Sequence, residues 1–189
     1  TGAFAIDSSS GAITVADTSA IDYESGTTCT ITVRATSADS STSDTTFTVT
    51  LTDVNEFDVG AVTDTDSDAN TLAEDVSNGA SAEITASASD ADGTTNTVTY
   101  AITEQSCSGA FAIDSSSGAV TVADTGAIDY DSGTTCTITV RATSADGSTS
   151  DATFTVTLTD VNDQTPTYTS ADTTPSVAEG TTSVETVVI

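Results

Sequence analysis

Two short acidic segments hold the residues whose types and spacing best suit metal binding. Thr52-Asp53-Val54-Asn55-Glu56 and Thr159-Asp160-Val161-Asn162-Asp163 each bring carboxylate and amide oxygens together within a few positions. Such oxygens are the ligands of hard cations, and Ca²⁺ takes about six to eight of them. Each segment ends a stretch in which Phe, Val or Leu alternates with Thr. We therefore expect each to join two units of β-structure, and we call them the first and the second linker.

The two linkers belong to a longer repeat. The stretch Gly2–Gly11 recurs as Gly109–Gly118, an offset of 109 − 2 = 107 positions. Beyond the linkers, Leu72-Ala73-Glu74 matches Val177-Ala178-Glu179 at an offset of 179 − 74 = 105 positions. We therefore expect this chain to be a piece of a longer array of repeats. It would contain three parts: the C-terminal part of one repeat at residues 1–56, a complete repeat at 57–163, and the N-terminal strands of a third repeat at 164–189.

Short β-strands must position these linkers. In the complete repeat, short stretches in which Thr alternates with apolar residues recur about every ten positions. Such alternation is typical of strands with one buried face. No stretch has a helical period, and seven strands in about 107 residues predict an all-β fold of tandem, seven-stranded Greek-key β-sandwiches. The expected strands are an irregular one around Leu72, then Glu83–Ala88, Thr97–Ile102, Gly109–Ile113, Ala119–Ala123, Thr135–Ala142 and Ala152–Leu158. The expected core residues are Val98, Tyr100, Ile102, Phe111, Ile113, Val120, Val122, Ile138, Val140, Phe154, Val156 and Leu158.

The composition argues against several classes of function. The 189 residues include 29 acidic and two basic ones, Arg34 and Arg141, so the formal charge is −27. This charge repels nucleic acid and anionic lipid. No run approaches the roughly 18 apolar residues of a membrane span, so we expect no membrane insertion of this segment. The chain has no His, which removes His-based catalytic triads, and we expect no enzyme.

The three cysteines follow the repeat. Cys107 and Cys136 lie in the complete repeat, and Cys29 matches Cys136 because 136 − 29 = 107. We predict a Cys107–Cys136 disulfide, which implies an oxidising, extracellular compartment, and the alternative is two buried free thiols. The counterpart of Cys107 would fall before Thr1, so we expect the odd cysteine to result from where the segment is cut.

Acidic loops elsewhere in the repeat can add oxygens to each linker, because loops at the end of one sandwich face loops at the start of the next. The alternative is that these acids are ordinary solvated loop residues. For the first junction the candidate ligands are Asp22, Glu24, Asp53, Asn55, Glu56, Asp90, Asp92, Asn96 and Asp146. For the second junction they are Glu74, Asp129, Asp131, Asp160, Asn162 and Asp163. A further run, Asp64–Asn70, lacks the sixth-position glycine of an EF-hand loop and is either a solvated loop or a weak auxiliary site.

Taken together, these motifs resemble cadherin repeats, specifically the tandem cadherin-like repeats of giant bacterial surface proteins. Each motif is weak alone, but their combination is specific and covers essentially the whole chain. The motifs are Leu72-Ala73-Glu74-Asp75, Ala86-Ser87-Ala88-Ser89-Asp90-Ala91-Asp92 through Val98-Thr99-Tyr100, Phe111-Ala112-Ile113-Asp114, Ile128-Asp129-Tyr130-Asp131, Val140-Arg141-Ala142-Thr143 and Asp160-Val161-Asn162-Asp163.

The resemblance implies cadherin- or immunoglobulin-like sandwiches with Ca²⁺ bound between successive repeats. In the family the ligands are the glutamate of the first strand, the acidic pair before the long strand, the linker and the next repeat's Asp-x-Asp. These roles fall here on Glu74, Asp22, Glu24, Asp129, Asp131, Asp53, Asn55, Asp160, Asn162, Asp163, Asp90 and Asp92. The first linker departs from the pattern, with Glu56 where Asp is usual and Phe57 where Asn often follows. The number of ions per junction is therefore open, from about one to three.

Two functions are consistent with this sequence. The first is structural, a tandem segment of an extracellular or cell-surface stalk, adhesin or fibril that Ca²⁺ makes rigid at the junctions. The alternative is an adhesive module that binds carbohydrate or a neighbouring cell surface, although aromatic residues are few. The expected partners are adjacent repeats of the same chain, or identical subunits that donate strands in a fibril. We favour the continuous chain, because the tail contains no partner for Cys29. The Ser and Thr residues of the exposed faces are candidates for O-linked glycans.

Overall fold

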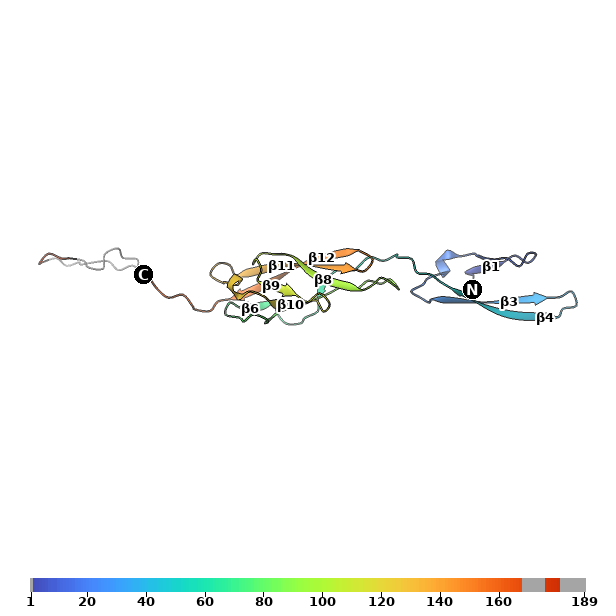
Figure 1. The fold of residues 1–189 in the computed structure, drawn as a ribbon, viewed down its shortest axis with the longest axis horizontal. Helices are drawn as coiled ribbons and strands as arrows, with labels where there is room; N and C mark the ends of the chain where they lie inside the picture. The colour runs from blue at the N-terminus through green and yellow to red at the C-terminus, as the bar shows by residue number, and fades with distance from the viewer. Residues whose placement is uncertain (1, 168–175, 181–189) are drawn as a thin grey trace.

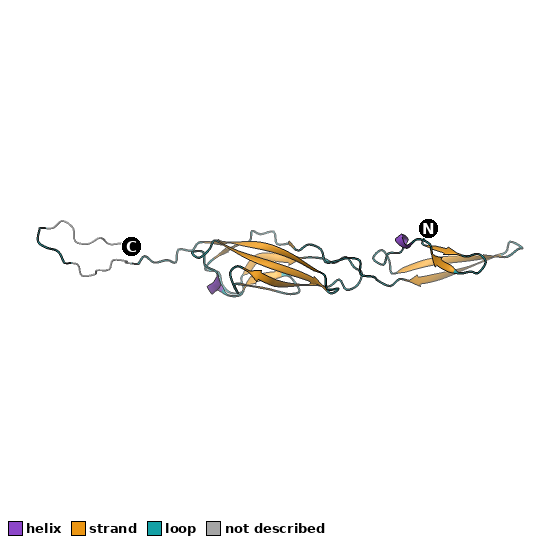
Figure 2. Cartoon of the chain, turned by 90° about the horizontal axis from the view of Figure 1, so that it is seen from above, coloured by secondary structure: helices purple, strands orange, loops and turns teal. Residues whose placement is uncertain are grey.

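The computed structural model describes residues 2–167 and 176–180. Two groups of strands lie end to end along an elongated chain (Figures 1 and 2). The helical elements of the described part are two 3-10 turns, η1 (Thr18–Ala20) and η2 (Thr125–Ala127), and no helix there is long and apolar enough to cross a membrane. Much of the expected third part, residues 168–175 and 181–189, lies outside the described residues.

The first group of strands, which we call the N-terminal unit, consists of two hairpins. β1 (Phe4–Ile6) pairs with β2 (Ile13–Val15). β3 (Thr28–Thr36) pairs with β4 (Thr42–Thr50) over its whole length. Both pairs are antiparallel, and the Thr residues of β3 lie opposite those of β4.

The second group, which we call the central sandwich, consists of two four-stranded sheets. One sheet has the order β5 (Thr63–Asp64), β7 (Ser81–Ser87), β10 (Ala119–Val122) and β9 (Phe111–Ile113). The other has the order β6 (Thr71–Ala73), β12 (Thr149–Thr159), β11 (Thr135–Ser144) and β8 (Val98–Gln105). Neighbouring strands are antiparallel except β6 and β12, which are parallel. The all-β sandwich is confirmed.

The first strand of the sandwich differs from the prediction. The expected strand around Leu72 is divided into β5 and β6, which belong to different sheets, so the seven expected strands become eight. The division has a local cause. Asp64 Oδ1 accepts the backbone N–H groups of Asp66 and Thr85 at 3.0 Å each, and this side chain thereby turns the backbone out of the ladder.

Alternation along the strands builds the core. Every second residue of β11 is buried, from Cys136 to Ser144. Of the expected core residues, eight are buried, while Val98, Ile102, Ile113 and Phe154 are half-buried against the core. The prediction missed Val59, Val62, Leu72, Ala82, Ile84, Ala86, Ala110, Ile128, Cys136 and Ala142.

The N-terminal unit lacks the cover that the central sandwich has. Val15 is 50% exposed, whereas its repeat counterpart Val122 is 2% exposed. In the central sandwich β10 pairs with β7 and β11 pairs with β8. Among the described residues of the N-terminal unit there is no counterpart of β7 or β8, so one apolar face stays open.

A disulfide joins Cys107 to Cys136, with 5.5 Å between their Cα atoms and a sequence separation of 29. Cys136 is fully buried on β11, so the bridge ties the segment after β8 to the middle of the core. Cys29 is a free thiol and is half-buried.

Replacing both bridged cysteines, in Cys107→Ser/Cys136→Ser, is expected to lower the unfolding free energy of the central sandwich by about 3–4 kcal/mol, because the unfolded chain is no longer closed into a loop. Denaturant unfolding followed by circular dichroism measures the loss. Cys29→Ser is the matched control and should change the stability of the central sandwich by less than about 0.5 kcal/mol. Equal effects of the two variants would contradict the prediction.

Candidate metal centre

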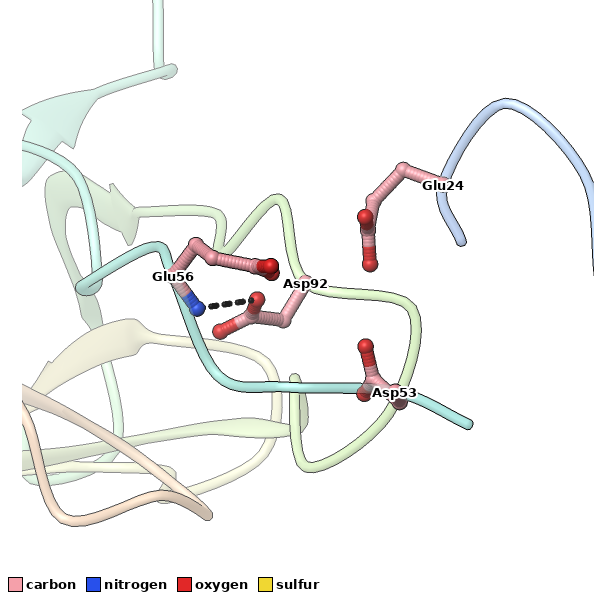
Figure 3. Close-up of side chains that lie close together, drawn as sticks. All are labelled: Glu24, Asp53, Glu56 and Asp92. Carbon is pink, nitrogen blue, oxygen red and sulfur yellow. Dashed lines mark hydrogen bonds between the residues drawn. The ribbon is translucent and has the colours of Figure 1, made fainter. Parts of the chain in front are cut away.

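Four carboxylates meet where the N-terminal unit joins the central sandwich (Figure 3). They belong to Glu24, Asp53, Glu56 and Asp92, and one oxygen of each lies within 4.8 Å of the others. Glu24 comes from the loop between η1 and β3, and Asp92 comes from the loop between β7 and β8. Asp53 and Glu56 lie on the first linker, so the group joins three separate segments of the chain.

Backbone hydrogen bonds hold these side chains in place. Asp92 is 1% exposed, and its Oδ1 accepts the backbone N–H groups of Glu56 at 3.1 Å and Phe57 at 3.4 Å. Glu24 Oε1 accepts the N–H of Gly93 at 2.9 Å. The carboxylates therefore fasten the linker and the N-terminal unit to one loop of the sandwich.

Asp53 makes an analogous contact with the same loop. Its Oδ2 accepts the backbone N–H of Thr94 at 3.0 Å, and the Thr94 hydroxyl donates to the same oxygen.

Two oxygens of this group are buried and have no hydrogen-bond partner, Asp53 Oδ1 and Asp92 Oδ2. A buried carboxylate oxygen without a donor is costly, so buried charges normally pair with cations or coordinate metals. No arginine is free to fill this role, because Arg34 is paired with Asp44 and Arg141 with Asp151 at 2.7 Å each. The chain has no lysine. An all-oxygen set with unsatisfied carboxylates fits Ca²⁺.

A second group of three carboxylates lies beside the first. One oxygen each of Asp90, Asp92 and Asp146 lies within 4.8 Å of the others, so Asp92 belongs to both groups. Hydrogen bonds from the backbone and hydroxyl of Ser148, assisted by the Asn55 side chain, lower the pKa of Asp146. Asn55 of the linker therefore lies near this second group.

The two remaining candidates at the first junction hold loops. Asp22 accepts the N–H of Glu24 at 3.0 Å and the hydroxyl of Ser25 at 2.6 Å. The Asn96 amide donates to the carbonyl of Asp92 at 2.6 Å. Asp22 and Asn96 thus shape the loops that carry Glu24 and Asp92. Among the described residues Asp22 belongs to none of the acidic groups.

At the second junction Glu74 spans two segments. Its Oε2 accepts the N–H of Tyr130 and its Oε1 accepts the N–H of Val161, each at 2.7 Å. Asp129 accepts the N–H of Asp131 at 3.0 Å, and Asp163 accepts the Gln164 amide at 3.1 Å. Asp160 and Asn162 are exposed on the linker. The described residues do not bring these six candidates into one group.

A third acidic group was missed in part by the sequence analysis. Asp66 and Asp68, from the run Asp64–Asn70, lie within 4.8 Å of Glu83. Glu83 is on β7, where its φ of 53° places it in the left-handed region, and the register between β7 and β10 is irregular there. Alternation along β7 carries no signal for such a bulge, so only the structure reveals this neighbour.

Comparison with known proteins agrees with the fold. The family model described as "Cadherin domain" matches residues 69–159. Residues 69–159 are therefore a cadherin-like repeat. A search of curated proteins found no match.

Solved cadherin structures resemble this chain over more of its length than residues 69–159. Human CDH23 EC21-23 has a TM-score of 0.73 and 24% identity, covering 99% of this chain and 60% of that one. The protocadherin GammaB4 extracellular domain has a TM-score of 0.72 and 24% identity, covering 90% and 26%. Mouse protocadherin-24 EC1-3 has a TM-score of 0.70 and 20% identity, covering 99% and 62%. At these identities the likeness shows a shared fold, and this chain spans less than two thirds of each of the three solved chains.

Without calcium, the stability of the junction should depend on pH through Glu56. Desolvation of its carboxyl raises its pKa above the ordinary 4.5, and the charges of Glu24, Asp92, Asp53 and Asp22 raise it further. An acid with a raised folded pKa binds more protons in the folded state, so stability should increase as pH falls through the raised pKa towards 4.5. Asp22 and Asp146 have lowered pKa values and should cost stability only as pH falls below 3.8.

Thermal unfolding in chelator between neutral pH and pH 4.5 tests this prediction, with Glu56→Gln as the comparison. The variant should lose the increase in melting temperature that the unchanged chain shows over this range. Identical pH profiles of the two proteins would contradict the assignment to Glu56.

Proposed function

We propose that this chain is part of a tandem array of extracellular repeats in which Ca²⁺ at each junction makes the array rigid. The observation that carries the proposal is the pair of buried, unpartnered oxygens, Asp53 Oδ1 and Asp92 Oδ2, within a group of four carboxylates. A divalent cation supplies the positive charge that these oxygens lack.

The candidate ligands come from both sides of the junction. Glu24 belongs to the N-terminal unit, Asp53 and Glu56 to the linker, and Asp92 to the central sandwich. Asp92 also belongs to the group with Asp90 and Asp146, which supports two neighbouring cation positions. A bound cation would neutralise the repulsion among these carboxylates. The N-terminal unit and the sandwich would then share ligands and lose freedom to bend.

The division into repeats belongs to the same proposal. We assign residues 1–56 to the end of one repeat, 57–163 to a complete repeat and 164–189 to the start of a third. The open apolar face around Val15 and the covered position of Val122 support this assignment, since the N-terminal unit has the strands of only half a sandwich.

The extracellular location rests on chemistry and on fold. The Cys107–Cys136 disulfide persists in oxidising compartments, and the matching family model describes a cadherin domain. We further propose adjacent repeats as the partners, in the setting of a large surface protein or fibril. O-linked glycosylation of the exposed Thr and Ser residues stays a prediction, for which an intact mass larger than that of the polypeptide is the test.

Calcium should stiffen the chain, and Asp92→Asn should weaken this effect. Asn at this position keeps an acceptor for the linker N–H groups but removes a charge shared by both acidic groups. We expect calcium affinity at the junction to fall by at least about tenfold, because affinity depends on the number of charged ligands. Isothermal titration calorimetry measures the affinity, and small-angle X-ray scattering with calcium and then chelator measures the bending between units.

Asp58→Asn is the matched control, since Asp58 is an exposed acid next to the linker that belongs to none of the acidic groups of the described residues. It should leave calcium affinity within about twofold of the unchanged chain. The proposal would be refuted by scattering profiles that are the same with calcium and with chelator.

A further inference from the structure

The junction contains a contact between the N-terminal unit and the central sandwich that involves no carboxylate pair. The aromatic ring of Tyr23 lies over the backbone of Gly93. A Cβ atom placed on Gly93 would be 2.6 Å from both Cδ1 and Cε1 of Tyr23, and 3.1 Å from Oε1 of Glu24. Carbon atoms in favourable contact are about 3.5–4.0 Å apart, so only a residue without a side chain allows the ring so close.

The backbone conformation of Gly93 does not itself demand glycine. Its φ is outside the left-handed region, unlike that of Gly118, which has a φ of 74°. A loop of the isolated sandwich could therefore contain alanine at this position without strain. The requirement for glycine comes from the other unit, through Tyr23.

Neighbouring contacts show that the loop is built to receive the N-terminal unit. The N–H of Gly93 donates to Glu24 at 2.9 Å, beside the contact with the ring. The preceding residue, Asp92, accepts the N–H of Glu56, and the following residue, Thr94, donates to Asp53. Three consecutive residues of one loop therefore contact the N-terminal unit or its linker, and the glycine is in the middle.

The repeat counterpart of Tyr23 provides a comparison. Tyr130 is half-buried and packs against the core of its own sandwich. Its backbone N–H is held by Glu74. Tyr130 is therefore held by its own sandwich, whereas the ring of Tyr23 lies close to Gly93 of the adjoining unit.

We propose that Tyr23 and Gly93 form a docking contact that sets the relative position of two successive repeats before any cation binds. Tyr23 and Gly93 are positioning residues, and the partner that this surface fits is a repeat with glycine directly after its Asp-x-Asp motif. By seating the ring on the glycine, the contact brings Glu24 within reach of Asp53 and Asp92. The contact goes beyond the calcium proposal, because it is made by uncharged groups.

A cycle of four proteins tests the proposal in chelator, where calcium plays no part. The proteins are the unchanged chain, Gly93→Ala, Tyr23→Ala and Gly93→Ala/Tyr23→Ala. Residual dipolar couplings of each unit, measured by NMR, report whether the two units share one alignment. We expect the added methyl group to disturb the shared alignment when Tyr23 is present, and to add no further disturbance once the ring has been removed.

Calcium affinity is a second readout, and only this readout rests on the proposed calcium site. With Tyr23 present, Gly93→Ala should lower the affinity at least about fivefold. In the Tyr23→Ala background the same change should alter it less than about twofold. If Asp92→Asn leaves calcium binding intact while the alignment in chelator still responds to Gly93→Ala, the calcium proposal fails and the docking contact stands.

Matched controls distinguish the contact from general loop damage. Gly26→Ala changes a glycine in the same loop as Tyr23, where a Cβ meets nothing within 4 Å and φ is not left-handed. Tyr130→Ala removes the counterpart ring at the other end of the sandwich. Both should keep the alignment of the unchanged chain. The proposal is overturned if Gly93→Ala has no effect on alignment, or if its effect is the same with and without the Tyr23 ring.

Discussion

Repulsion among the carboxylates clustered at the first junction is the interaction on which the arrangement of this chain depends. The sequence has 29 acidic residues and two arginines, and both arginines are engaged with aspartates on their own sheets. Nothing within the chain can therefore neutralise Asp92, which is fully buried, or Asp53 beside it. Main-chain N–H groups satisfy one oxygen of each carboxylate, and the opposite oxygens are left without partners. The linker and the sandwich loop that meet at the junction thus each carry a buried carboxylate oxygen without a partner.

Two kinds of contact hold the junction, and they respond to different conditions. The carboxylates of Asp53 and Asp92 accept main-chain N–H groups with one oxygen and are suited to a cation with the other, so under the calcium proposal their effect would vary with calcium. The ring of Tyr23 on Gly93 depends on shape alone. Under the two proposals, a junction with both kinds would keep its two units aligned at low calcium and become rigid when calcium rises. The proposed Tyr23–Gly93 contact would limit how far the candidate ligands separate and so reduce the conformational entropy lost when calcium binds.

Much of the fold could be predicted, because alternation and repeat offset are both local properties of the sequence. β11 and β12 follow the expected pattern, and the disulfide predicted between the two cysteines of the complete repeat, Cys107 and Cys136, is confirmed. The divided first strand could not be predicted, since β5 and β6 are too short to show a period. The sequence indicates Glu74 as a junction residue. It cannot indicate that Tyr130 and Val161 occupy its oxygens, because these residues are 56 and 87 positions away. Likewise, the steric need for Gly93 depends on a ring 93 − 23 = 70 positions earlier.

The parallel pairing of β6 with β12 has a mechanical consequence. Along the chain, β6 is the first strand of this sheet and β12 the last. In the sheet they are neighbours, with Thr71–Ala73 directly beside Thr157–Thr159. When the chain is pulled from its two ends and the two-residue β5 has separated from β7, the load acts on β6 and β12 in opposite directions along adjacent strands. The hydrogen bonds between them are then sheared together and do not open one after another. The Cys107–Cys136 bridge keeps the segment between these cysteines out of any extension that follows, so the sandwich yields a shorter length of chain under tension than its residue number suggests.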